Sequence, residues 1–220
     1  GQSSISQTLT NTTNTVQTVV YTVTPTSGDA GSCVGSTFTV TVTVNPKATI
    51  ANKTVSACSG SGFTVTPTNG TDIIPTGTTY AWSAPSVTGN LTGGVSASAQ
   101  ASIAGTLTNP TNIAQTATYT VTPTSGTCNG ATFTVTATIN PKPVVPNQTA
   151  TICSGETFTT APTNNAPTTI IPTGTTYTWT VAPNANVTGE SDQSTGQSSI
   201  SQTLTNTTNT VQTVVYTVTP

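Results

Sequence analysis

Four cysteines are the residues of this sequence that are best suited to covalent chemistry. Cys58 and Cys153 each begin a Cys-Ser-Gly string, whereas Cys33 and Cys128 each precede a Thr-Phe-Thr-Val string. Cysteines that recur at equivalent places predict disulfide bonds formed in an oxidising compartment. The chemistry to be expected is therefore cross-linking outside the cell.

Groups that could catalyse a reaction or bind an ion are scarce. The chain has three Lys or Arg residues, five Asp or Glu residues and no His. Acid–base catalysis needs a titratable group with a tuned pKa, and no Ser-His or Cys-His pair can form without His. A calcium site at Asp29, Glu190 and Asp192 is disfavoured, because the last two have no acidic counterparts in the repeat described below. We predict no enzymatic activity, no cofactor and no metal site.

The same composition limits the partners. Three positive charges are too few for a surface that binds nucleic acid by neutralising phosphates, or for a polybasic membrane contact. No apolar run approaches the roughly 20 residues that a membrane-spanning helix needs. We therefore predict neither nucleic-acid binding nor membrane insertion in this part of the chain.

An internal repeat is the strongest signal in the sequence. Residues 1–25 reappear letter for letter at 196–220. Within this long period, the string Tyr-Thr-Val-Thr-Pro begins at Tyr21, Tyr119 and Tyr216. The resulting spacing of about 97 residues is too long for a solenoid repeat and is typical of a small β domain.

Two Asn-Pro-Lys strings set the boundaries of the repeated units. They end strand-like runs at residues 45–47 and 140–142 and read as linkers. The predicted organisation is a first unit at 1–46, which is the C-terminal part of a domain, a complete central unit at 47–141, and a third unit at 142–220 that holds most of another domain. We therefore interpret the sequence as part of a longer array of such units.

Short alternating stretches predict β-strands throughout the central unit. From Phe133 to Ile139, apolar residues alternate with Thr, the pattern of a strand with one buried and one exposed face. Similar stretches fall near residues 48–57, 62–67, 77–84, 87–98, 101–108 and 115–123. Because no stretch has a helical period, we predict an all-β fold, with tandem immunoglobulin-like antiparallel β-sandwiches arranged end to end.

Several side chains have both a functional and a structural interpretation. Tyr80 with Trp82, and Tyr177 with Trp179, each share one face of a strand, so core aromatics are favoured over a sugar-stacking platform. Alternate threonines at 37–43 and 132–138 form rows of a kind that can bind ice or crystalline polysaccharide, but ordinary exposed strand faces are favoured. Lys47 and Lys142 are interpreted as solvated linker residues rather than as isopeptide cross-links.

Four strings of the repeat resemble PKD-like domains of giant cell-surface adhesins from Bacteroidetes-type bacteria. They are the Cys-Ser-Gly turns at Cys58 and Cys153, the Gly-Thr-Thr-Tyr-x-Trp strand, the Tyr-Thr-Val-Thr-Pro strand, and the Cys-bearing turn before Phe-Thr-Val-Thr. The resemblance implies exported sandwich modules, including the type used in gliding motility and sent out by type IX secretion. Residues 82–85 and 179–182 replace the acidic string of PKD relatives, so no calcium or ligand role is carried over.

Strand geometry restricts which cysteines can pair. A strand from Lys47 to Cys58 spans roughly 35 Å, which places Cys58 at the far end of its domain and Cys128 at the near end. We favour inter-domain staples, in which Cys58 and Cys153 pair with the following domain and Cys33 and Cys128 with the preceding one. The alternatives are local closure as Cys33–Cys58 and Cys128–Cys153, pairing within a domain, and free thiols.

The predicted function is that of a spacer or stalk in a large secreted cell-surface adhesin or extracellular filament, whose repeats contact neighbouring repeats of the same chain. The alternative is a set of carbohydrate- or surface-binding modules that bind polysaccharide by avidity. Strand donation between separate subunits is a further possibility. The identical ends of the sequence favour one covalent chain instead.

Overall fold

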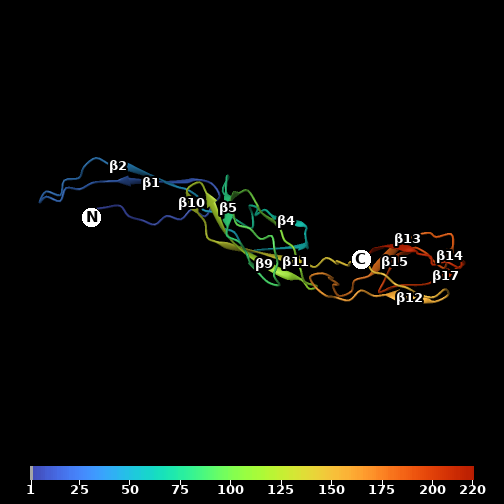
Figure 1. Ribbon diagram of the computed structural model, residues 1–220. Helices are drawn as coiled ribbons and strands as arrows, with labels where there is room; N and C mark the ends of the chain where they lie inside the picture. Colours follow the sequence, from blue (N-terminus) through green and yellow to red (C-terminus); the bar gives the residue numbers. More distant parts are fainter. Residues whose placement is uncertain (1) are drawn as a thin grey trace.

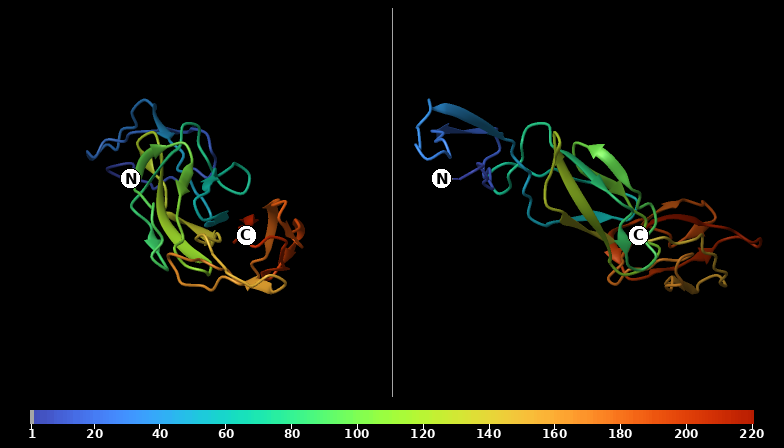
Figure 2. Two further views of the ribbon diagram at one scale, coloured as in Figure 1. Left: turned by 45° about the vertical axis from the view of Figure 1, so that its right-hand side comes forward. Right: turned by 90° about the vertical axis from the view of Figure 1, so that its left-hand side faces the viewer.

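The computed structural model describes residues 2–220, and this range contains strands, turns and loops without any helix. The three units follow one another along an elongated molecule, with the first unit at one end and the third at the other (Figure 1). Two further views show the same order (Figure 2). The predicted all-β fold is confirmed.

The central unit is built from two sheets. The larger sheet has the strand order β3-β11-β9-β5-β7, with two short strands, β6 and β10, also paired to β9. Its strands are β3 (Lys53–Cys58), β5 (Thr79–Trp82), β6 (Ser86–Val87), β7 (Ala97–Gln100), β9 (Gln115–Ser125), β10 (Cys128–Asn129) and β11 (Phe133–Asn140). The smaller sheet pairs β4 (Gly62–Val65) with β8 (Ile103–Thr106).

Alternation along β9 and β11 supplies most of the core between these sheets. On β11 the side chains from Phe133 to Ile139 are buried at every second position, and the threonines between them are half-buried. Tyr119 of β9 makes edge-to-face contacts with Phe63 and Trp82, at ring-centroid distances of 5.9 and 6.4 Å. Such aromatic pairs add to the free energy gained by burying their apolar area.

One strand pair differs from the predicted antiparallel arrangement. β11 pairs antiparallel with β9, but it pairs parallel with β3, so that Asn140 lies opposite Cys58. The first and last strands therefore run in the same direction, and the chain enters the unit at one end and leaves it at the other. Periodicity reveals which face of a strand is buried but not the direction of its neighbour.

The first and third units contain parts of the same architecture. The first unit is an antiparallel pair of β1 (Gln17–Val23) and β2 (Phe38–Val44). The third unit contains the sheets β15-β13-β18, β12-β16 and β14-β17. Its strands are β12 (Thr157–Thr160), β13 (Tyr177–Ala182), β14 (Val187–Thr188), β15 (Gln193–Gln197), β16 (Ile200–Thr203), β17 (Thr205–Asn206) and β18 (Val215–Thr219).

A buried ion pair fixes the entry segment of the central unit. The Asp72 carboxylate is 5% exposed, accepts a 2.7 Å hydrogen bond from Lys53 Nζ, and accepts another from the backbone N–H of Ala51. Burial alone would raise the pKa of this carboxyl, but the hydrogen bond and charge of Lys53 and the Ala51 N–H outweigh burial and lower the pKa. A buried charge is tolerated only when it is paired in this way.

Asn109 binds β11 to the loop that precedes β9. Its side chain is 1% exposed, and its Nδ2 donates to the carbonyls of Ile113 and Ile139, at 2.7 and 2.9 Å. Its Oδ1 accepts from the backbone N–H of Thr111. The hydrogen bond to the Ile139 carbonyl is buried, and a buried carbonyl left without a donor is costly.

Replacing Lys53 by Met leaves the Asp72 carboxylate buried without its cation. We expect the free energy of unfolding of the central unit to fall by about 1–3 kcal/mol at pH 7. The pKa of Asp72 is lower in the folded state than in the unfolded state, where it is about 3.9. The ion pair therefore stabilises the fold fully above the unfolded pKa, and this stabilisation is lost as the pH falls through the folded-state pKa. The deficit of the Lys53→Met variant should therefore shrink in acid.

Urea unfolding followed by Trp82 fluorescence in a Trp179→Phe background would measure this deficit. The exposed Lys142 provides the matched control, and Lys142→Met should unfold like the parent. A Lys53→Met deficit that stays constant from pH 7 to pH 2 would show that the ion pair does not stabilise the unit as described.

Replacing Asn109 by Ala should lower the unfolding free energy of the central unit by about 1–3 kcal/mol, because the carbonyls of Ile113 and Ile139 lose their hydrogen-bond donor. The same fluorescence assay would report the change. Asn129 is exposed, and its amide contacts only the Thr124 hydroxyl among the described residues, so Asn129→Ala is the control. Equal losses in the two variants would contradict the role given to Asn109.

Candidate functional site

Tight turns place the two Cys-Ser-Gly strings at one end of the central unit and one end of the third unit. In the turn Cys58–Ser61, the Ser61 N–H donates to the Cys58 carbonyl at 2.9 Å, and Gly60 has φ 79°. The equivalent bond joins Glu156 to Cys153 at 3.1 Å. A turn with positive φ at its third position strongly favours Gly there, which explains why the string recurs.

The two cysteines of the central unit lie at opposite ends of it. Cys58 is opposite Asn140, where the chain leaves the unit. Cys128 is in β10, next to Gly130, whose Cα faces the Ala48 carbonyl where the chain enters. The length of β11 separates these ends by roughly 25 Å, at about 3.3 Å per residue. A disulfide between them is therefore geometrically excluded in this fold.

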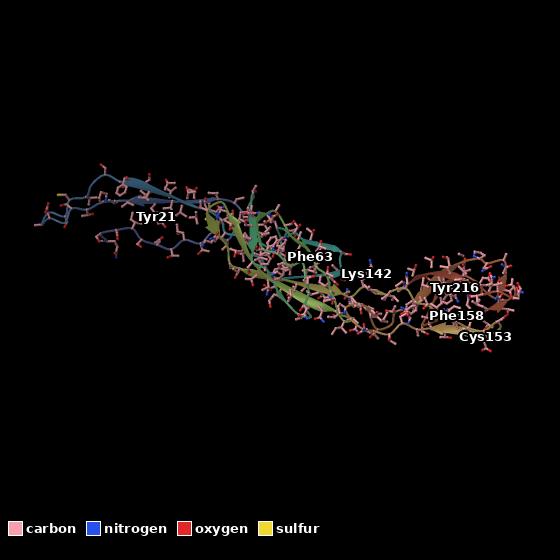
Figure 3. The ribbon with its side chains drawn as sticks, in the orientation of Figure 1. Tyr21, Phe63, Lys142, Cys153, Phe158 and Tyr216 are labelled. Carbon is pink, nitrogen blue, oxygen red and sulfur yellow. The ribbon has the colours of Figure 1, made fainter. Side chains whose placement is uncertain are left out.

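The described residues contain no disulfide, and all four cysteines are free. The favoured inter-domain staples, whose partner cysteines lie mostly in neighbouring domains outside this range, stay a prediction. Local closure fails for a geometric reason. Cys33 lies in the loop between β1 and β2, away from the end of the central unit that carries Cys58. Cys153 lies at the outer end of the third unit (Figure 3), whereas Cys128 lies at the entry end of the central unit.

The aromatic side chains singled out in the sequence face the interior. Tyr80 and Trp82 are buried, and so are Tyr177 and Trp179. The indole N–H of Trp82 donates to the Val95 carbonyl, and that of Trp179 donates to the Ser191 carbonyl, both at 3.1 Å. Rings held in this way have no exposed face on which a sugar could stack.

Other candidate groups are dispersed over the surface. Lys47, Lys142, Asp29 and Asp192 are exposed, and Lys142 lies between the central and third units (Figure 3). Asp192 accepts a hydrogen bond from the Val181 N–H, which gives this acid a local structural role. Within residues 2–220, no three His, Cys, Asp or Glu side chains gather closely enough to hold a metal ion. The same range has no helix of the length and apolarity needed to span a membrane.

The threonine rows lie on strand faces away from the core. In β2 the threonines are exposed, and in β11 they are half-buried beside the threonines of β9. A hollow of about 390 Å³ at the junction of the first and central units is lined by uncharged residues, among them Asn14, Pro46 and Thr127. Neither feature brings together groups that could do acid–base or nucleophilic chemistry.

The third unit contains only part of the strand arrangement of the central unit. β18 is the counterpart of β9 and pairs with β13 along one side only. Residues 142–220 contain no counterpart of β11, and Gln148–Cys153, which match β3, form no strand. Val215 on β18 is 60% exposed.

The asparagine of the third unit repeats the local hydrogen bonds of Asn109. Asn206 Oδ1 accepts a hydrogen bond from the Thr208 N–H, and Asn206 Nδ2 donates one to the Thr210 carbonyl. Asn109 makes the same two bonds with Thr111 and Ile113. In the first unit the identical Asn11 also donates to Val44 of β2, at 2.9 Å. This role was not predicted, although the recurring Thr-Asn-x-Thr-Asn string is a signal for it in the sequence.

Comparison with known proteins agrees with this architecture. A family profile described as "PKD-like domain" matches residues 1–48, 52–143 and 150–220. No curated protein matches the chain. Because the three matched ranges cover nearly the whole sequence, this chain belongs to the PKD-like domain family.

Proposed function

We propose that these PKD-like modules form a spacer or stalk of a secreted cell-surface adhesin or extracellular filament. One observation carries the proposal. β3 and β11 run parallel, so the chain passes through the central unit from one end to the other. Modules with their entry and exit at opposite ends extend in line, and each added module lengthens the stalk. The domains would be those given by the sequence boundaries at 46/47 and 141/142.

The surface chemistry also supports a spacer. The strand residues Tyr80, Trp82, Tyr177 and Trp179 are buried, the charged groups are dispersed, and the exposed strand faces carry Thr. The partners in this proposal are neighbouring modules of the same chain, at an extracellular location. The resemblance to gliding adhesins further suggests export by the type IX route. Thiols at the module ends would then act as staples between successive modules in an oxidising environment.

A glycan array probed with the 220-residue chain tests the spacer proposal. We expect no binding above the level of an inert sandwich protein, because the candidate stacking residues Tyr80, Trp82, Tyr177 and Trp179 are buried. Clear and selective binding to one polysaccharide class would overturn the spacer proposal and favour repeated binding modules that act by avidity.

Non-reducing peptide mapping of the oxidised chain tests the proposed role of the thiols. We expect no Cys58–Cys128 linkage within one molecule, because these residues lie at opposite ends of the central unit. Linked peptides should join Cys58 or Cys153 of one molecule to Cys33 or Cys128 of another. Recovery of Cys58–Cys128 within one molecule as the main product would contradict the staple proposal.

A further inference from the structure

The strands at the entry and at the exit of the central unit are neighbours in its larger sheet. β3 follows the entry and β11 leads to the exit, and they pair parallel over six positions, from Lys53 opposite Val135 to Cys58 opposite Asn140. The first unit precedes this pair and the third unit follows it, at opposite ends of the central unit (Figure 1). A pull on the two neighbouring units therefore draws β3 and β11 past each other, along the direction of the strands.

This loading direction makes the bonds between the two strands act together. In a parallel pair the hydrogen bonds run between the strands at even spacing. A force along the strands strains all of these bonds at once, whereas a force that separates the strands at one end strains them one after another. The β3–β11 pair therefore resists sliding more strongly than peeling.

Side chains add a bond between the same two segments at each end of the pair. At the entry end, Asn52 Oδ1 accepts a hydrogen bond from the Thr134 N–H at 2.9 Å. At the exit end, Asn140 Nδ2 donates to Ser56 Oγ at 3.1 Å, and the Asn140 carbonyl accepts from the Ser59 N–H at 2.8 Å. All of these bonds must break before β3 can slide along β11.

Both strands are also fixed to the body of the central unit. Before β3, Thr49 and Ile73 exchange backbone hydrogen bonds of 3.0 and 2.9 Å. At the start of β3, Lys53 binds the buried Asp72 carboxylate. β11 is held on its other side by β9 and by side chains that are buried at every second position. A load that enters at the N-terminal end of the unit therefore reaches the exit through the β3–β11 pair.

We propose that the β3–β11 pair is a shear clamp, through which the complete module carries tension along the chain. This inference rests on the proposed spacer function and adds a load-bearing role to it. The parallel pairing that places entry and exit at opposite ends also loads the pair in its more resistant direction. Unfolding under force is governed by the unfolding rate, so the clamp is measured as a force or as a rate under force.

Single-molecule pulling of the full chain in two directions tests the clamp. In a background with the four native cysteines changed to Ser, handles are attached at Lys47→Cys and Lys142→Cys, so that only the central unit lies between them. A second variant carries its handles at Lys47→Cys and Thr132→Cys, both on the entry side, so that β3 and β11 are peeled apart. All three handle positions are exposed. We expect a several-fold greater unfolding force in the first variant. Equal forces, or a greater force on peeling, would overturn the proposal.

The variant Asn140→Ala, measured in both directions, tests whether the side-chain bond at the exit end shares the load. Under end loading the loss of the Asn140–Ser56 bond should make unfolding at a fixed force several-fold faster. During peeling from the entry end this bond is strained last, so the rate should change little. Asn129→Ala removes an exposed amide outside the pair and should leave both rates unchanged.

An Asn140→Ala effect that is equal in the two directions, or absent from both, would overturn the clamp. Either result would leave a spacer that bears no load, so the spacer proposal, which the glycan array tests separately, would stand.

Discussion

The insertion of β11 between β9 and β3 is the interaction on which the rest of the central unit depends. It closes the larger sheet, brings Phe133, Val135 and Ile139 over the core, and receives the Asn109 amide. Because β11 is antiparallel to one neighbour and parallel to the other, it also determines that the chain leaves at the end opposite to its entry. Core stability and the linear order of the modules thus have a common cause.

A comparison of the central and third units shows how the core depends on the insertion of a strand like β11. Where a β11-like strand is flanked on both sides, the core is continuous and its large side chains are almost fully buried. In the third unit the buried cluster is reduced to Tyr177, Trp179 and Ile200, with Phe158 and Tyr216 partly buried beside it (Figure 3). The residues that match β3 form no strand there, since their parallel partner is not present among residues 142–220.

The sequence predicted which face of each strand is buried better than it predicted which strands pair. Alternation from Phe133 to Ile139 reports burial directly, and the Gly60 turn follows from local backbone preferences. The parallel partner of β11 could not be predicted, because strand direction depends on contacts between residues far apart in the chain. The role of Asn109 was missed for the same reason, since one of its acceptors, Ile139, is a long-range partner. The inter-domain disulfides expected from the recurring cysteines stay a prediction, because cysteine spacing carries no information on which ends meet.

Hydrogen exchange at two equivalent segments tests most directly whether the last strand completes each sheet. In the dilute chain, the amides of Lys53–Cys58 should be protected and those of Gln148–Cys153 should exchange rapidly. A synthetic peptide with the sequence of residues 36–46 should then protect Gln148–Cys153, whereas a scrambled peptide should not. Protection of Gln148–Cys153 without the peptide, or exchange that the peptide leaves unchanged, would contradict this account.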